Sequence, residues 1–153
     1  MKKFELTSET KINIFGKKLF RIKALVSFGV VKTGETGGWV EKEENVNQSG
    51  DAWVFGNAEV FGNARVSGDA EVSGNAEVSG NADYTTIHGF GTQFRTTTFF
   101  RCKDKQVKVS CGCFYGTIPE FREQVKNTRD GKIAEEYLMI ADLMEKHFAE
   151  EAK

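Results

Sequence analysis

The sequence predicts a mainly β chain that winds through short parallel strands around a narrow core and ends in helices. Three observations lead to this expectation. Six consecutive hexapeptides fill residues 50–85, a hairpin pattern precedes them, and strands followed by two amphipathic helices come after them. A fixed short period determines the fold of its segment more strongly than any single residue does.

Each hexapeptide begins with Gly, has Asn or Asp at its second position and Ala at its third. The fourth position varies, the fifth is usually Val, and a sixth residue completes the repeat. The Ala and the aliphatic residue are two positions apart, so they point to the same side of a strand, and the residue between them points outward. Gly followed by Asn or Asp tolerates the left-handed backbone of a sharp corner. The inward positions are Ala52, Ala58, Ala64, Ala70, Ala76 and Ala82 with Val54, Val60, Val66, Val72, Val78 and Tyr84.

These repeats resemble those of hexapeptide-repeat proteins, in which three hexapeptides form one triangular coil of a left-handed parallel β-helix. The resemblance implies a short left-handed β-helix of about three coils, and the handedness comes from the family alone. Val40 and Val46 fall at the Ala position of two degenerate hexapeptides, so we expect the helix to begin near Gly38. The expected segments are an N-terminal β cap (1–37), the β-helix (38–85), a β-hairpin (86–116) and C-terminal helices (117–153).

If three repeats form a coil, residues eighteen positions apart stack about 4.8 Å from each other. This predicts the stacks Val54/Val72, Val60/Val78, Val66/Tyr84, Arg65/Asp83 and Glu59/Glu77. The glutamate pair is unfavourable unless a cation or another chain intervenes.

Three aromatic side chains of the first coil, Trp53, Phe55 and Phe61, leave the inward set and have no apolar counterpart one coil later. We expect the N-terminal segment, a second subunit or both to cover them. They are the predicted oligomer interface, and hexapeptide-repeat proteins are commonly homotrimers.

The run ALVSFGVVKTGETGGWVEKEENVNQSGDAWVFGNAEV, with the later GCFYGTIPEF and a helix, resembles a type of small protein encoded by phages and prophages. Such proteins join a Gly-Gly-aromatic-aliphatic-Glu lead-in to Gly-Asn-Ala-x-Val repeats. The resemblance implies fold and origin but no settled activity.

The flanking segments show further patterns. Residues 11–15 and 18–24 flank Gly16-Lys17, a hairpin turn, and residues 93–103 and 106–115 flank Asp104-Lys105. The second register pairs Phe100 with Val109 and Cys102 with Val107, on a face that should close the repeats. Thr117 and Glu120 form a capping box that starts a helix ending near Asn127, and a second helix runs to about Ala149. Leu138, Met139 and Leu143 fall outside the apolar stripe of that helix, which predicts burial against another protomer.

Net charge is −1, but residues 1–37 carry +5, residues 38–85 carry −7, residues 86–116 carry +4 and residues 117–153 carry −3. Near-zero net charge and an acidic middle argue against binding to long nucleic acid. No apolar run is long enough for a membrane span and no signal peptide is evident, which predicts a cytoplasmic protein, in the host cytoplasm if phage-encoded. Cys102, Cys111 and Cys113 are expected to be free core thiols, because the hairpin places Cys102 and Cys111 roughly 13 Å apart, and neither a metal nor a cofactor is expected.

Acyltransferases of this fold use a histidine general base between subunits. His88 and His147 both lie outside the repeats, and no loop interrupts residues 50–85 to form an acceptor site. The sequence therefore favours a protein without catalytic residues over an acyltransferase-like enzyme or a purely structural assembly protein.

A binding function has two supports in the sequence. Basic and aromatic side chains interleave on one face of the second hairpin, which suits a stacked base and a phosphate, and the N-terminal hairpin is basic. The candidate ligand-binding residues are Arg21, Lys23, Arg95, Phe99, Arg101 and Phe114. The competing expectation is that Phe99 and Phe114 pack under the C-terminal helices. The hypothesis is a trimeric phage counter-defence protein that sequesters a small, nucleotide-like anion or blocks a host defence protein.

Overall fold

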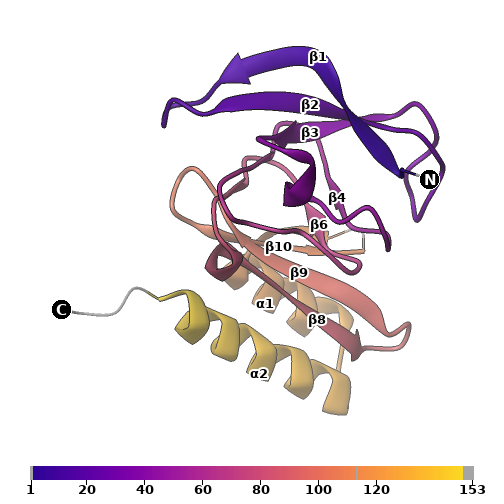
Figure 1. Ribbon diagram of the computed structural model, residues 1–153. Coiled ribbons are helices and arrows are strands. Elements are labelled where there is room, and N and C mark those ends of the chain that lie inside the picture. Colours follow the sequence, from indigo (N-terminus) through magenta and orange to yellow (C-terminus); the bar gives the residue numbers. More distant parts are fainter. Residues whose placement is uncertain (1, 113, 150–153) are drawn as a thin grey trace.

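The computed structural model of the protein describes residues 2–112 and 114–149. Its parts lie in layers along the molecule (Figure 1): the N-terminal hairpin, the strands of the repeats, a four-stranded sheet, and two helices. No helix in these residues is long and apolar enough to cross a membrane.

The first layers share a five-stranded mixed sheet of order β1-β2-β3-β5-β7. Antiparallel pairing joins β1 to β2 and β2 to β3, whereas β3, β5 and β7 pair in parallel. A separate parallel pair joins β4 to β6. The strands are β1 (Phe4–Ile12), β2 (Lys18–Ala24), β3 (Thr36–Val40), β4 (Trp53–Val54), β5 (Glu59–Val60), β6 (Glu71–Val72) and β7 (Glu77–Val78), with 3₁₀ turns at Glu43–Asn45 and Asn81–Asp83.

The C-terminal half is an antiparallel sheet covered by helices. Its strand order is β11-β10-β9-β8. The strands are β8 (Tyr84–Phe90), β9 (Arg95–Arg101), β10 (Val107–Cys111) and β11 (Phe114–Thr117), and the helices are α1 (Ile118–Thr128) and α2 (Gly131–Phe148).

The prediction of a left-handed parallel β-helix of about three coils is therefore wrong. The chain is mainly β with two C-terminal helices, but its sheets are mixed or antiparallel. Repeat strands are only two residues long and form short parallel ladders. The flanking segments add longer antiparallel strands to the sheets, because their alternating apolar pattern continues over more residues. In the repeats a corner follows each two-residue strand, so no longer strand can form there.

Within the repeats, the inward columns are confirmed. Val54 pairs with Val72 and Val60 with Val78 in parallel, and all four side chains are buried. Val40, however, pairs with Val60, and Val46 bridges to Val66. The two residues that we assigned to the Ala position thus belong to the Val column, at a spacing of twenty residues instead of eighteen.

The last predicted stacks fail because the period ends at Tyr84. Among the described residues Tyr84 forms no ladder pair with Val66; it begins β8 and pairs with Phe100, while its hydroxyl donates to the Arg65 carbonyl. Asp83 likewise pairs with Arg101, with Nε 3.3 Å from Oδ1, and not with Arg65.

The β9–β10 register is displaced by one residue from the prediction. Phe99, not Phe100, faces Val109. Cys102 N–H bonds to the Gln106 carbonyl, so the loop has three residues, with Lys105 in the left-handed region at φ +70°. A one-residue shift exchanges the faces of a strand, so Phe100 and Cys102 pack with the repeats, whereas Phe99, Val109 and Cys111 pack with the helices. Cys111 was predicted to share the face of Cys102, which is wrong; Cys113 lies outside the described residues.

Both helices form as predicted. Glu120 N–H donates to Thr117 Oγ1 at 3.3 Å and Thr117 N–H donates to Glu120 Oε1 at 2.8 Å, which confirms the capping box. Tyr137, Ile140, Ala141, Met144 and Phe148 bury the stripe of α2. Leu138 packs partly against this core, while Met139 and Leu143 remain exposed.

The aromatic side chains of the first coil are covered largely by the chain's own N-terminal layer. Trp53 is 1% exposed and lies between Phe4 and Phe28, at centroid distances of 5.7 and 5.2 Å. Phe61 packs with Leu19 and Trp39. The N-terminal segment of the same chain thus covers Trp53 and Phe61, which is one of the alternatives that the sequence analysis gave. Phe55 is partly buried.

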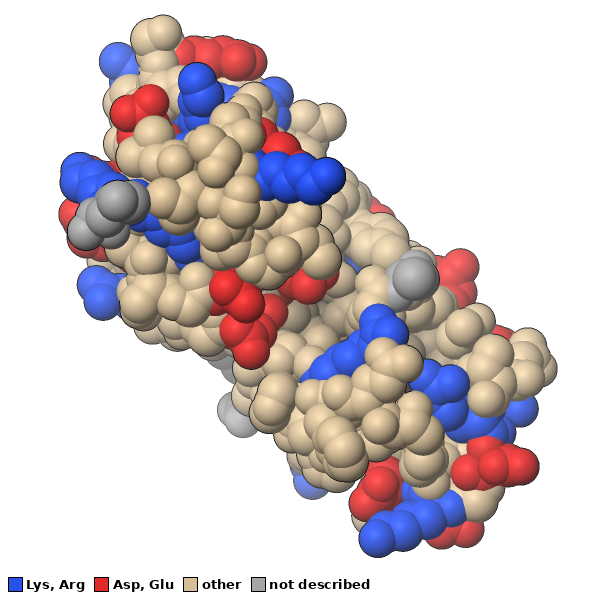
Figure 2. Space-filling view, turned by 90° about the vertical axis from the view of Figure 1, so that its right-hand side faces the viewer, with Lys and Arg blue, Asp and Glu red and all other residues tan. Residues whose placement is uncertain are grey.

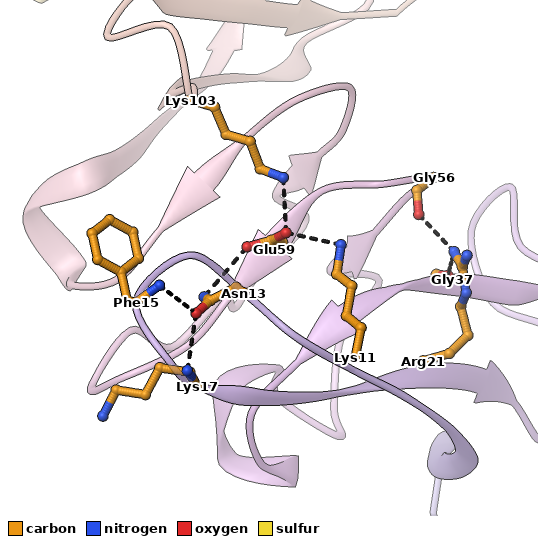
Figure 3. A network of polar contacts seen from close by, with 9 residues as sticks. All are labelled: Lys11, Asn13, Phe15, Lys17, Arg21, Gly37, Gly56, Glu59 and Lys103. Atoms are coloured by element: carbon orange, nitrogen blue, oxygen red, sulfur yellow. Dashed lines mark hydrogen bonds and ion pairs between the residues drawn. The ribbon is translucent and has the colours of Figure 1, made fainter.

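A buried carboxylate connects three of the layers (Figure 3). Glu59 on β5 is 2% exposed, and its Oε2 lies 2.9 Å from Lys11 Nζ on β1 and 2.8 Å from Lys103 Nζ after β9. Asn13 Nδ2 donates to Oε1 at 3.4 Å. Burial opposes ionisation of Glu59, but the hydrogen bonds and charges of Lys103 and Lys11 outweigh it and lower its pKa.

Glu77 stacks on Glu59 in the parallel ladder, but its carboxylate lacks the lysine partners that Glu59 has in the described part of the chain. Its Oε2 is buried with no hydrogen-bond partner among the described residues. Burial, and then the charge of Glu59, raises the pKa of Glu77. The sequence predicted that this pair is unfavourable unless a cation or another chain intervenes. Two cations, Lys11 and Lys103, are present, and both form their ion pairs with Glu59.

We predict that Val60→Asp abolishes the folded protein. Val60 is completely buried between Val40 and Val78, and an unpaired charge there costs a large part of the roughly 5–15 kcal/mol that stabilises a domain. Circular dichroism of the soluble fraction measures this, with Arg65→Asp, at an exposed position of the next repeat, as the control. An unchanged melting temperature in Val60→Asp would refute the inward Val column.

We predict different effects on stability for two matched substitutions, Glu59→Gln and Glu77→Gln. Glu59→Gln should lower the free energy of unfolding at pH 7 by about 2–3 kcal/mol, less than the loss of a fully buried pair, because both lysines keep part of their contact with water. Glu77→Gln should leave stability unchanged or raise it, since it removes a buried charge without a partner.

The pH dependence follows from the same pKa shifts. A lowered folded-state pKa means that the contribution of Glu59 is present above about 4.3, the ordinary glutamate value, and is lost as the pH falls through the lower folded value. Urea unfolding between about pH 3 and pH 7 measures the free energy of unfolding of both variants. An equal loss of stability in Glu59→Gln and Glu77→Gln would contradict this assignment.

Candidate ligand-binding site

A cavity of about 340 Å³ opens at one end of the antiparallel sheet, under the helices. It lies between the β8–β9 turn, the end of β10, and the junction of α1 with α2. Its lining residues are Phe90, Gly91, Thr92, Gln93, Arg95, Cys111, Phe114, Phe121, Gln124, Val125, Thr128, Arg129 and Tyr137.

Two glycines leave the space that the cavity needs. Gly91 has φ +80°, and a Cβ there would lie 2.5 Å from the Tyr137 hydroxyl. Gly112 has φ +59°, and its Cβ would collide with the Arg95 guanidinium. Both positions combine a left-handed backbone with a close approach, so any other residue would displace one of these two polar side chains.

Two arginines supply positive charge to the cavity. Arg95 Nε donates to Gln93 Oε1 at 3.1 Å, which holds the guanidinium near the β8–β9 turn. Arg129 caps the C-terminal end of α1. Among the described residues, neither Arg95 nor Arg129 forms an ion pair with a carboxylate. Arg122 on α1, by contrast, contacts both Asp142 and Glu145.

The phenol of Tyr137 is a neutral donor in this site. Tyr137 is 5% exposed, and burial raises its pKa, with a further contribution from Cys111 that Arg129 and Arg95 oppose. Its O–H therefore stays protonated at neutral pH and can donate to an anion. The Cys111 thiol accepts a hydrogen bond from Thr97 Oγ1 at 3.1 Å.

Aromatic rings form the apolar wall. Phe121 lies at the centre, with its centroid 5.7 Å from Phe114 and 5.8 Å from Tyr137 in an edge-to-face contact. A wall of rings next to two guanidinium groups matches the general character of ligand pockets, which are mostly apolar with few placed polar groups.

The structure brings Arg95 and Phe114 of the predicted site together and separates the others from them. Phe99 is buried under the helices against Phe121, as the competing expectation had it. Arg101 is occupied by Asp83 and by the Phe148 carbonyl.

The two N-terminal candidates lie on β2, in another layer of the molecule. Arg21 donates to the carbonyl oxygens of Gly37 and Gly56 and lies over the Trp39 ring at 4.3 Å, so it has a structural role. Lys23 pairs along β2–β3 with Thr36. Neither residue lines the cavity.

Sequence reasoning missed Arg129 and Tyr137, which the helices bring to the cavity. The only signal was that Arg129 lies between two helices, where the chain has to turn. Phe55 from the predicted oligomer interface lines a different groove, with Asp51, Asp69 and Glu71.

The two histidines lie apart from the cavity. His88 Nδ1 is 2.8 Å from Thr96 Oγ1 on β9, and the His147 ring packs on Phe148 at 5.0 Å. On the face that Figure 2 shows, basic and acidic side chains alternate without an extended patch of one sign.

A scan against protein-family models finds no match for this chain, and a search of the curated proteins finds no significant relative.

Proposed function

We propose that the protein binds a small anion with a planar apolar part, of the nucleotide class, in the cavity between the β8–β9 turn and the helices. The observation that carries the proposal is the pair Arg95 and Arg129 beside the rings of Phe114 and Phe121. Arginine suits phosphate or carboxylate recognition because its planar fork presents paired donors.

The chemistry of the wall determines which part of the ligand lies where. The anionic group would lie between the two guanidinium groups, within reach of the Tyr137 phenol. The planar part would pack on the aromatic wall, where burial and stacking both favour it. At about 340 Å³ the cavity is at the small end of ligand pockets, which favours a mononucleotide-sized compound over an oligomer.

The biological setting of this binder is proposed on the resemblance of the repeats to phage-encoded proteins. A phage protein that holds a nucleotide signal without converting it would suppress a host defence that depends on that signal. The proposal assigns no catalytic residue to the cavity, since binding and release are sufficient for sequestration.

We predict that Arg95→Ala and Arg129→Ala each weaken ligand binding at least about tenfold, the effect of losing one charge-assisted contact. Native mass spectrometry of the purified protein identifies a co-purified ligand, and calorimetry with a panel of nucleoside monophosphates measures affinity. Arg122→Ala is the matched control, because Arg122 lies on α1 and, within residues 2–112 and 114–149, its side chain bonds to Asp142 and Glu145 and does not line the cavity.

Two further outcomes decide the matter. Equal loss in Arg122→Ala would mean that the effect comes from helix stability and not from the cavity. Tight binding that survives the combined Arg95→Ala and Arg129→Ala substitution would place the ligand elsewhere and refute the proposal.

A further inference from the structure

Helix α2 presents an apolar pair to solvent on the side away from the core. Met139 is 69% exposed and Leu143 is 55% exposed, and residues four apart lie next to each other on a helix surface. Figure 1 shows α2 as the outermost element of the C-terminal layers. The tip of the N-terminal hairpin also exposes apolar side chains, but only α2 surrounds its pair with an ordered set of charges.

The charges beside this pair follow from helix geometry. At 100° per residue, Glu135 and Lys146 lie on one side of the Met139–Leu143 strip, and Glu136 and His147 lie on the other. On each side the acidic residue is near the beginning of the helix and the basic or titratable residue is near its end. Asp142 and Glu145 are already paired with Arg122, at 2.8 and 2.9 Å.

We propose that two copies of this chain associate through α2, antiparallel and related by a two-fold axis that passes between Met139 and Leu143. Met139 of one copy then packs against Leu143 of the other. Lys146 lies opposite Glu135 of the other copy, and Glu136 opposite His147. A two-fold axis repeats each contact, so the two helices form four complementary polar pairs.

The charge pattern selects this orientation over the parallel one. In a parallel two-fold pair, Glu135 would face Glu136 of the other copy and Lys146 would face His147, and acidic groups that face each other disfavour association. Two exposed apolar side chains per copy make a small interface. The dimer is therefore weak and concentration-dependent, as expected below about 1,200 Å² of buried surface.

Sedimentation velocity of the full chain, from about 10 μM to about 1 mM, tests the apolar centre. The wild type should shift from monomer to dimer over this range. The combined variant Met139→Glu and Leu143→Glu should stay monomeric with an unchanged circular dichroism spectrum and melting temperature. Ile14→Glu is the control, because Ile14 is 86% exposed on the hairpin tip, and it should dimerise like the wild type.

Charge reversal tests the orientation. Lys146→Glu alone and Glu135→Lys alone should each raise the dimer dissociation constant about tenfold, since each places like charges opposite one another. The chain carrying both changes should regain wild-type association. In the parallel arrangement, by contrast, Glu135→Lys alone would already strengthen association, because residue 135 would then face Glu136 of the other copy. A monomeric wild type at the highest concentration, a persistent dimer in the Met139→Glu/Leu143→Glu variant, or no recovery in the doubly reversed chain would each overturn the proposal.

Discussion

The ion pairs of Glu59 are the interaction on which the joining of the layers depends. A carboxylate on the second of the regular repeats is removed from water and then neutralised by Lys11 from the N-terminal hairpin and Lys103 from the C-terminal sheet. Removal of either lysine from the folded chain would leave this buried carboxylate with one partner fewer, which is destabilising. Repeat arrays commonly add stability one unit at a time, whereas here one charge makes the three segments interdependent.

The parts of the fold that could be predicted are those in which a local pattern has one solution. Alternation of Ala and Val with corner glycines allows one inward column, and Thr117 with Glu120 allows one helix start. The overall architecture could not be predicted in the same way, because strand partners outside the repeats are selected by competition between segments. The hexapeptide period specifies how Val60 pairs with Val78. It contains no information about which strands outside the repeats, such as β3 and β2, extend that sheet.

The β9–β10 register shows where a local pattern has two solutions. Phe99 and Phe100 are adjacent, so both faces of β9 are apolar and hydrophobic alternation does not distinguish the registers. The loop decides between them: Lys105 accepts a left-handed backbone, which makes a three-residue loop possible where a two-residue loop was expected. Arg129 and Tyr137 were missed for a different reason: the sequence predicts the two helices that carry them, but not where these helices lie on the sheet.

The two buried faces of β9 also explain why the cavity lies at the end of this sheet. Phe100 points to the repeats and Phe99 to the helices, and both are completely buried. A sheet covered on both faces has no free surface for a ligand, so a site can form only at its rim. Gly91 in the β8–β9 turn leaves room for the Tyr137 phenol, Gly112 after β10 leaves room for the Arg95 guanidinium, and the α1–α2 junction adds Arg129. Arg95 was predicted to act from the face of a strand, whereas its position at the beginning of β9 is what brings it to the cavity.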